Sequence, residues 1–137
     1  MTQDLHPLSR YPHASGLLVG LLPLPVHLLL PSLWSHQLAA ITLILIAGIY
    51  IGYGFKDGRP KALATELLTA LGFTAAAWFG MQGYPWAIAL ALAMHGVWDV
   101  LQHSLIDTEI PRWYIPFCAT VDWVMAACLM AIWYGLA

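Results

Sequence analysis

The chain has 137 residues, of which 61% are hydrophobic and only 9% are charged, and its formal net charge is −2. Because a soluble domain carries about a quarter charged residues, this chain has too few to cover a surface that faces water. Its 5 lysine and arginine residues are also too few for the basic surface that nucleic acid requires. The composition therefore excludes a soluble enzyme, a nucleic-acid-binding protein and a disordered module, and it predicts an integral membrane protein whose main partner is the lipid bilayer.

The N-terminal part of the chain predicts a short tail followed by a kinked span. Residues 1–13 are polar, and we expect them to form a cytoplasmic tail. Residues 14–33 are apolar but contain Pro23, Pro25 and Pro31, so we expect a membrane helix with a kink, since neighbouring helices can satisfy the backbone groups that proline frees. A re-entrant segment is the alternative. A signal peptide is not expected, because no small-x-small cleavage site follows.

Four longer apolar segments follow, at residues 37–55, 62–81, 86–105 and 113–136. Each is long enough, at about 1.5 Å per residue, to cross the roughly 30 Å of a hydrocarbon core. The sequence therefore predicts an all-α, polytopic membrane protein. We expect residues 14–137 to form a single transmembrane domain, a bundle of five helices of which the first is kinked by proline.

The basic residues predict the orientation of this bundle. With five spans, Arg10 in the tail, Lys56, Arg59 and Lys61 in one loop and Arg112 in another all fall on the same side. The positive-inside rule makes that side cytoplasmic. We therefore expect a multi-pass protein of the cell inner membrane, with its N-terminus in the cytoplasm and its C-terminus outside. A four-span arrangement would place the tail on the other side and fits the rule less well.

Two glycine pairs predict close helix contacts. Gly16 and Gly20, and likewise Gly48 and Gly52, are four residues apart in the first and second spans. Glycines at this spacing let two helix backbones approach closely. We interpret them as a contact between these two spans, and a homo-oligomer through either pair is the second interpretation.

Ionisable side chains inside the predicted spans are the main functional signal, because each costs at least about 2.5 kcal/mol in a bilayer. His95, Asp99 and His103 are four residues apart in one span, so they form a polar stripe along one helix face. Imidazole and carboxylate groups are ligands of zinc, iron, manganese and copper. The stripe extends over about 12 Å, too far for one ion, so a metal site would need one adjacent pair and further ligands from other helices.

Other spans carry acids at matching depths. Counting about 1.5 Å per residue from the basic side predicts three pairs: Asp122 with His95, Cys118 with Asp99, and Glu66 with His103. We therefore predict that His95, His103 and Asp122 bind a divalent metal, zinc or iron. Asp99 is either a further ligand or the group that orients a histidine, with a catalytic role in either case, and Glu66 is the candidate catalytic base.

Such a site predicts a metal-dependent hydrolase that acts on a lipid-like small molecule entering from the bilayer. The metal would lower the pKa of a bound water, and a carboxylate would move its proton. One alternative is a proton or cation pathway, but the outer half offers only His27 and His36, and His27 is expected to pair with nearby backbone. A structural or accessory subunit of a membrane complex is the other alternative.

These residues resemble an uncharacterised bacterial membrane family, domain of unknown function 6010. The resemblance extends from about Ile49 to Tyr134 and rests on three motifs: Tyr53-Gly-Phe-Lys-Asp-Gly-Arg-Pro-Lys61 with Glu66, His95-x2-Trp98-Asp99-x3-His103, and Ile115-Pro-Phe-Cys118-x3-Asp122. It implies a small polytopic inner-membrane protein and no particular activity. A weaker likeness, to alkaline ceramidases and adiponectin receptors, implies zinc held by histidines four residues apart, although here Asp99 stands between the histidines and the chain is shorter.

Overall fold

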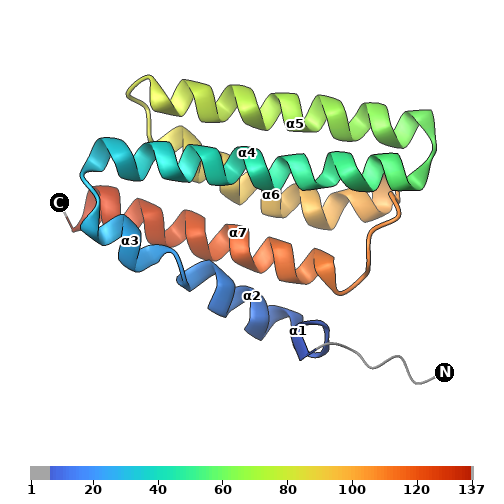
Figure 1. Ribbon diagram of the computed structural model, residues 1–137, viewed down its shortest axis with the longest axis horizontal. Coiled ribbons are helices and arrows are strands. Elements are labelled where there is room, and N and C mark those ends of the chain that lie inside the picture. The colour runs from blue at the N-terminus through green and yellow to red at the C-terminus, as the bar shows by residue number, and fades with distance from the viewer. Residues whose placement is uncertain (1–6, 137) are drawn as a thin grey trace.

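The computed structural model describes residues 7–136, and these form helices with no strand among them (Figure 1). The elements are α1 (Pro7–Arg10), α2 (Pro12–Leu21), α3 (Leu24–Leu29), α4 (Ser32–Asp57), α5 (Pro60–Met81), α6 (Trp86–Leu105), α7 (Tyr114–Met130) and a π-helical turn η1 (Ala131–Gly135). The predicted tail lies partly outside the described residues. The expected all-α bundle of five helical segments is confirmed, with α2 and α3 forming the first of them and η1 extending the last.

Four segments are long and apolar enough to cross a membrane: Pro12–Leu29, Ser32–Asp57, Pro60–Met81 and Tyr114–Gly135. Helix α6 is equally suited by length, because its 20 residues extend for about 30 Å. Its mean hydropathy is lower because it carries two histidines, an aspartate and a glutamine. The polar residues of α6 therefore set it apart from the other spans.

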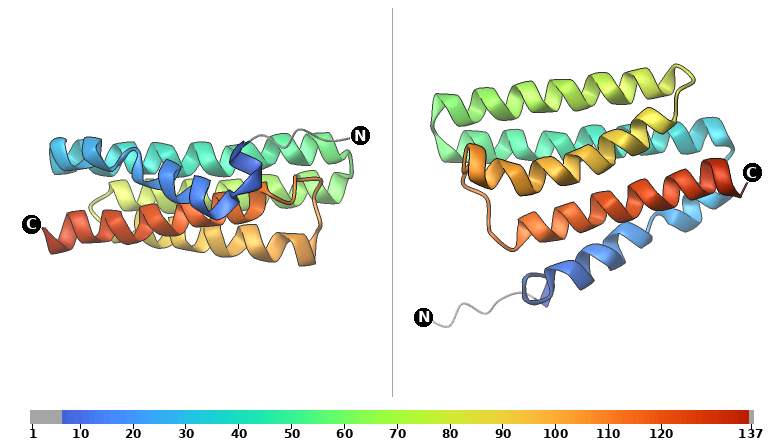
Figure 2. Two further views of the ribbon diagram at one scale, coloured as in Figure 1. Left: turned by 90° about the horizontal axis from the view of Figure 1, so that it is seen from below. Right: turned by 180° about the vertical axis from the view of Figure 1, so that it is seen from behind.

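Successive helices run in opposite directions, so the connections gather at two ends of the bundle (Figure 1). The α4–α5 and α6–α7 loops lie at one end, near α1, and we call this the basic end because it carries the exposed residues Arg10, Lys56, Arg59, Lys61 and Arg112. Both further views keep α2 beside α7 and α5 on the far side of the bundle (Figure 2). The structure thus places all five basic side chains at one end, as the sequence predicts.

Proline and glycine set the breaks between helices. Helix α2 ends at Leu21 and α3 begins at Leu24, because Pro23 and Pro25 lack the amide hydrogen that a continuous helix would need. Helix α4 ends where Gly58 adopts a left-handed conformation (φ +80°), which a residue with a side chain rarely takes. The predicted proline kink in the first span is therefore present.

Most buried apolar and polar side chains occupy different parts of the bundle interior, with His27 and Ser35 as polar exceptions in the apolar part. The half away from the basic end, the apolar half, is filled by a cluster of buried aliphatic residues: Ala39, Ala40, Leu43, Ala77, Ile88, Ala91, Leu92, Val121, Met125, Ala126 and Leu129. The buried polar residues Tyr50, Glu66, His95, Asp99, Gln102 and Asp122 lie at the middle of the bundle and toward the basic end. Outside, leucines such as Leu29 and Leu68, which are 86% and 70% exposed, face the surroundings, as a bilayer requires.

The two glycine pairs differ in what they face. A Cβ atom on Gly16 would lie 2.6 Å from the Phe117 carbonyl oxygen of α7, and one on Gly20 would lie 3.2 Å from the Val121 oxygen. Gly48, by contrast, has no atom within 4 Å of such a Cβ position, and neither has Gly52. The first pair therefore forms a close helix contact, but with α7 and not with the second span.

A hydrogen-bonded triad ties α3, α4 and η1 together in the apolar half. Trp133 Nε1 donates to Ser35 Oγ at 2.9 Å, and Ser35 Oγ lies 2.9 Å from His27 Nδ1. Because an indole can only donate, the Ser35 hydroxyl hydrogen is free to bond His27. The expectation that His27 pairs with nearby backbone is therefore wrong, since its partner is a side chain at the start of α4.

Replacing Ser35 by alanine is expected to lower the free energy of unfolding by about 1–3 kcal/mol, because it leaves the indole N–H of Trp133 and the imidazole of His27 without their partner. Ser32→Ala is the matched control, since Ser32 lies in the same first turn of α4 but is exposed. The measurement is thermal unfolding of both variants in detergent. Equal unfolding midpoints would show that the triad contributes no stability.

Candidate metal centre

Three buried side chains converge between α6 and α7. His95 and Asp99 lie one turn apart on α6 and so share a face, and Asp122 projects from α7. His95 Nδ1 lies 2.7 Å from Asp122 Oδ2 and 3.5 Å from Asp99 Oδ1. One nitrogen or oxygen atom from each residue lies within 4.8 Å of the others. The His95–Asp122 pair is the one that depth counting predicts.

Helices α4 and α5 supply the aromatic walls of this cluster. The ring of Tyr50 meets the His95 imidazole edge-on with centroids 5.3 Å apart, and the ring of Phe73 does so at 4.8 Å. Tyr50 and His95 are both about 1% exposed. Residues from four helices therefore surround the imidazole and fix its plane.

A glycine lets α7 approach α6 closely enough for this contact. A Cβ atom on Gly96, the residue after His95, would lie 2.5 Å from Trp123 Nε1 of α7. Without that Cβ, Trp123 reaches across and donates to the Ala93 carbonyl oxygen at 3.1 Å. The neighbouring Asp122 is thereby held beside His95.

Several polar atoms of the cluster make no hydrogen bond of good geometry with the described residues, although Asp99 lies close enough to interact with both Tyr50 and Asp122. These atoms are both carboxylate oxygens of Asp99, Oδ1 of Asp122 and the hydroxyl of Tyr50. Buried polar atoms are normally satisfied by protein or by ordered water. The unpaired oxygens therefore point to a further polar or cationic group as part of the complete site.

The charge of the cluster indicates a cation. Asp99 and Asp122 are both 0% exposed, whereas every lysine and arginine side chain lies exposed at the basic end. A buried carboxylate is strongly unfavourable unless it is paired or coordinates a metal. If both acids are ionised and the imidazole is neutral, the cluster carries a charge of −2, which a divalent ion would balance; protonation of a carboxyl group is the other way to remove that charge.

The distances fit such an ion. Two ligand atoms on a tetrahedral zinc ion, each at 2.0–2.2 Å from it, are about 3.3 Å apart. The 3.5 Å separation of His95 and Asp99 is close to this value, whereas the 2.7 Å separation of His95 and Asp122 is that of a hydrogen bond and would have to widen by roughly 0.6 Å on binding. Three protein ligands leave one coordination position open, as in catalytic zinc sites and unlike closed structural ones.

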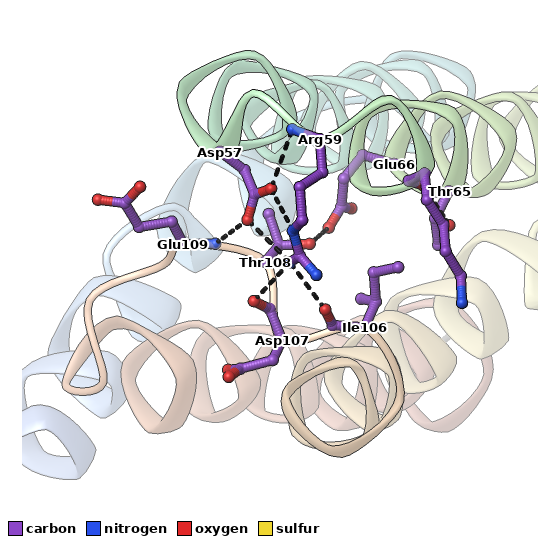
Figure 3. Close-up of polar contacts among 9 residues, drawn as sticks. Asp57, Arg59, Thr65, Glu66, Ile106, Asp107, Thr108 and Glu109 are labelled. Atoms are coloured by element: carbon purple, nitrogen blue, oxygen red, sulfur yellow. Dashed lines mark hydrogen bonds and ion pairs between the residues drawn. The ribbon is translucent and has the colours of Figure 1, made fainter.

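Two of the predicted site residues lie outside this cluster. The side chain of His103 is 40% exposed and pairs with Asp107 at 2.8 Å. Glu66 is fully buried and accepts a hydrogen bond from Thr108 Oγ1 at 3.0 Å (Figure 3). The structure therefore does not form the predicted Glu66–His103 pair.

Two residues near the site are absent from the sequence-based prediction. Tyr50 appeared as part of an apolar span, and nothing in the local pattern marks its hydroxyl as buried. Gln102 does carry a signal, because it follows His95 by seven residues, or two helical turns, and so lies on the same face of α6.

Cys118, which the sequence predicts to lie beside Asp99, is buried and lines a small cavity between α2, α4 and α7.

An apolar groove leads from the side of the bundle toward the cluster. It has a volume of about 570 Å³ and lies between α5 and α6, where Phe73, Phe79, Trp86 and Leu90 are among its lining residues. Phe73 also forms the aromatic contact with His95. Phe73 therefore belongs both to the groove lining and to the aromatic surroundings of the imidazole.

The comparisons with known proteins give a family and no activity. A sequence model described as a family of unknown function, DUF6010, matches residues 12–134. No curated protein and no solved structure matches the chain.

Proposed function

Because the chain belongs to the family of unknown function DUF6010, which has no activity in its description, we propose a function from the geometry of the buried cluster. We propose that His95, Asp99 and Asp122 bind one divalent metal ion inside the membrane, and that the protein is a metal-dependent hydrolase of a lipid-like substrate. The observation that carries this proposal is the convergence of three possible ligand atoms within 4.8 Å of one another, two of them on fully buried acidic side chains that no lysine or arginine of the described residues neutralises.

Zinc is the metal that this set of ligands suits best, and iron is the second candidate. Imidazole and carboxylate are ligands for both, and three protein ligands leave room for water. A bound water would lose a proton at near-neutral pH and attack an ester or amide carbonyl. The bond to the alcohol or amine would then break, and that product would take up the proton with the help of a carboxylate, for which Asp99 and Glu66 are the candidates.

The groove supports a substrate that arrives from the bilayer. Its lining is almost wholly apolar and it opens between two membrane-length helices, so an acyl chain can occupy it without losing a hydrogen bond. Phe73 at its inner end would place a polar linkage near His95. This arrangement supports a lipid-like substrate and gives a soluble, highly charged substrate no comparable route.

The setting of the protein is part of the proposal. Four apolar helices fit a membrane protein, and we place it in a cell inner membrane with the basic end in the cytoplasm, following the positive-inside rule. A homo-oligomer would use Gly48 and Gly52, because Gly16 and Gly20 already face α7. A continuous proton or cation pathway is less well supported, because aliphatic side chains fill the apolar half of the bundle.

The purified protein is expected to carry about one equivalent of a transition metal, since the site offers three ligands to a single ion. The measurement is elemental analysis after purification in detergent without chelator and with added zinc or iron. Hydrolysis of acyl esters and amides, lost on chelation and restored by zinc, would support the enzymatic part. Absence of metal under both conditions would contradict the proposal, whereas bound metal without hydrolysis would contradict the reaction alone.

A further inference from the structure

Buried polar groups continue from the candidate metal centre toward the basic end. Gln102 lies seven residues beyond His95 on α6, about 10.5 Å along the helix, and is 1% exposed. Neither atom of its side-chain amide has a hydrogen-bond partner within residues 7–136. Burying an amide without partners is costly, so ordered water or a bound ion is the group expected to satisfy this side chain.

Glu66 lies beside the same stretch of α6. Its carboxylate interacts electrostatically with His95 and lies close to the indole of Trp98, one turn before Gln102. One carboxylate oxygen accepts the hydrogen bond from Thr108, whereas the other, Oε2, makes no hydrogen bond of good geometry with the described residues, its nearest donor being the Trp98 indole. A second set of unpaired buried oxygens thus lies between the cluster and the basic end.

Glu66 also lacks a basic partner among the described residues. Arg59, in the loop before α5, is engaged by Asp57, which accepts from Arg59 Nε at 2.7 Å and from Nη2 at 2.9 Å. These hydrogen bonds raise the pKa of the Arg59 guanidinium, which keeps it charged and paired. A buried carboxylate with a free oxygen and no fixed counter-charge is suited to a mobile cation.

The loops at the basic end close over this position (Figure 3). Arg59 Nη2 donates to the carbonyl oxygens of Ile106 and Asp107 at 3.0 Å each, and Asp57 Oδ2 accepts from the Glu109 amide at 3.0 Å. The α4–α5 loop is thereby fastened to the α6–α7 loop, from which Thr108 reaches Glu66. These loop contacts therefore lie beside Glu66 at the basic end.

We propose that Glu66 and Gln102 form an entry site for a divalent cation, on a route from the basic end to the centre formed by His95, Asp99 and Asp122. The inference rests on the proposed metal centre. Carboxylate and amide carbonyl oxygens suit a partly hydrated cation, and one carboxylate beside a neutral amide holds it more weakly than the inner site. An ion would therefore pass inward and be retained by the imidazole and two carboxylates.

The direction from which a cation would enter follows from the different side chains in the two halves of the bundle interior. Toward the basic end the cluster continues into Gln102 and Glu66, whereas in the other direction the core consists of residues such as Leu43, Ile88 and Leu92, all 0% exposed. A cation cannot cross such a layer without losing its hydration. Metal exchange is therefore expected from the basic end alone.

The test is the rate of cobalt(II) uptake by metal-free protein in detergent, followed by the visible absorption of the bound ion. Glu66→Gln is expected to slow both uptake and release at least about tenfold, because negative charge in a narrow site raises ion on-rates by 10–10³-fold, with the same final stoichiometry. Gln102→Leu should slow exchange in the same way. It also removes unpaired polar atoms and is expected to fold. Glu109→Gln is the matched control, since Glu109 is an exposed acid in the loop that covers Glu66.

The outcomes separate this inference from the proposed function. Slower exchange with full final loading in the Glu66 and Gln102 variants would support it. Unchanged rates with full loading would overturn the entry site and leave the metal centre intact. Loss of bound cobalt in Glu66→Gln would make Glu66 a ligand of the inner site and also overturn the inference. No cobalt in the unmodified protein would overturn both proposals.

Discussion

Replacing His95 by alanine is expected to abolish metal retention, while the same replacement at His103 leaves it intact. His95 is the only residue of the cluster within reach of both carboxylates, at 2.7 Å from Asp122 and 3.5 Å from Asp99. Loss of a group that merely orients a ligand already costs 10–100-fold in metal affinity, so loss of the central ligand is expected to cost more than about 100-fold. The measurement is metal content by elemental analysis, together with cobalt(II) titration.

The His103→Ala variant is a strict control for this experiment. It changes the same residue type on the same helix by the same substitution, but His103 is partly exposed and pairs with Asp107. Circular dichroism in detergent checks that both variants keep their helices. Full metal content in both variants would contradict the assignment of His95 as a ligand, whereas loss of metal from both would show that His103 is also required.

Replacing Gly16 by alanine is expected to destabilise the bundle by about 1–3 kcal/mol, the usual cost of overpacking. The new Cβ would lie 2.6 Å from the Phe117 carbonyl oxygen and 2.9 Å from Thr120 Cβ. The first of these atoms belongs to the α7 backbone and cannot rotate away, so α2 has to move off α7. The measurement is the midpoint of thermal unfolding in detergent.

Gly48→Ala provides the comparison, because Gly48 is the first residue of a glycine pair with the same spacing, but a Cβ atom there would have no other atom within 4 Å. Alanine favours a helix over glycine by about 1 kcal/mol, so this variant should be as stable as the parent or slightly more stable. If Gly48→Ala instead weakens a dimer of the purified protein, the second glycine pair forms an interface between copies. Equal stability of the Gly16 variant and the parent would refute the close α2–α7 contact.

The sequence predicts most of the fold because its spans are separated by clear breaks. Gly58 and Pro60 end one helix and begin the next, and prolines interrupt the first span where the structure has its break between α2 and α3. The partner of Gly16 and Gly20 was not predictable in the same way. The spacing shows that some helix approaches closely, but which helix does so depends on the packing of the whole bundle.

The candidate site was predictable in part. Depth counting pairs His95 with Asp122 because both helices start from known boundaries and rise by the same amount per residue. The same counting fails for His103 and Glu66, because His103 turns toward Asp107 and Glu66 is met by Thr108 from a loop. The conformation of a loop does not follow from any periodicity in the sequence. The contact of Tyr50 with His95 was not predictable either, because it depends on the rotation of α4 about its own axis relative to α6.

The polar stripe of α6 also bears on how the protein is made. A histidine or aspartate near the centre of a span resists insertion by up to about 3.5 kcal/mol each, so α6 alone is a poor candidate for release from the translocon into lipid. Helix α7 carries Asp122, which satisfies His95 once the two helices pair. Insertion of α6 is therefore expected to await synthesis of α7, so that the two enter the bilayer as a hairpin. The residues that give the site its chemistry would then also determine the order in which the chain is assembled.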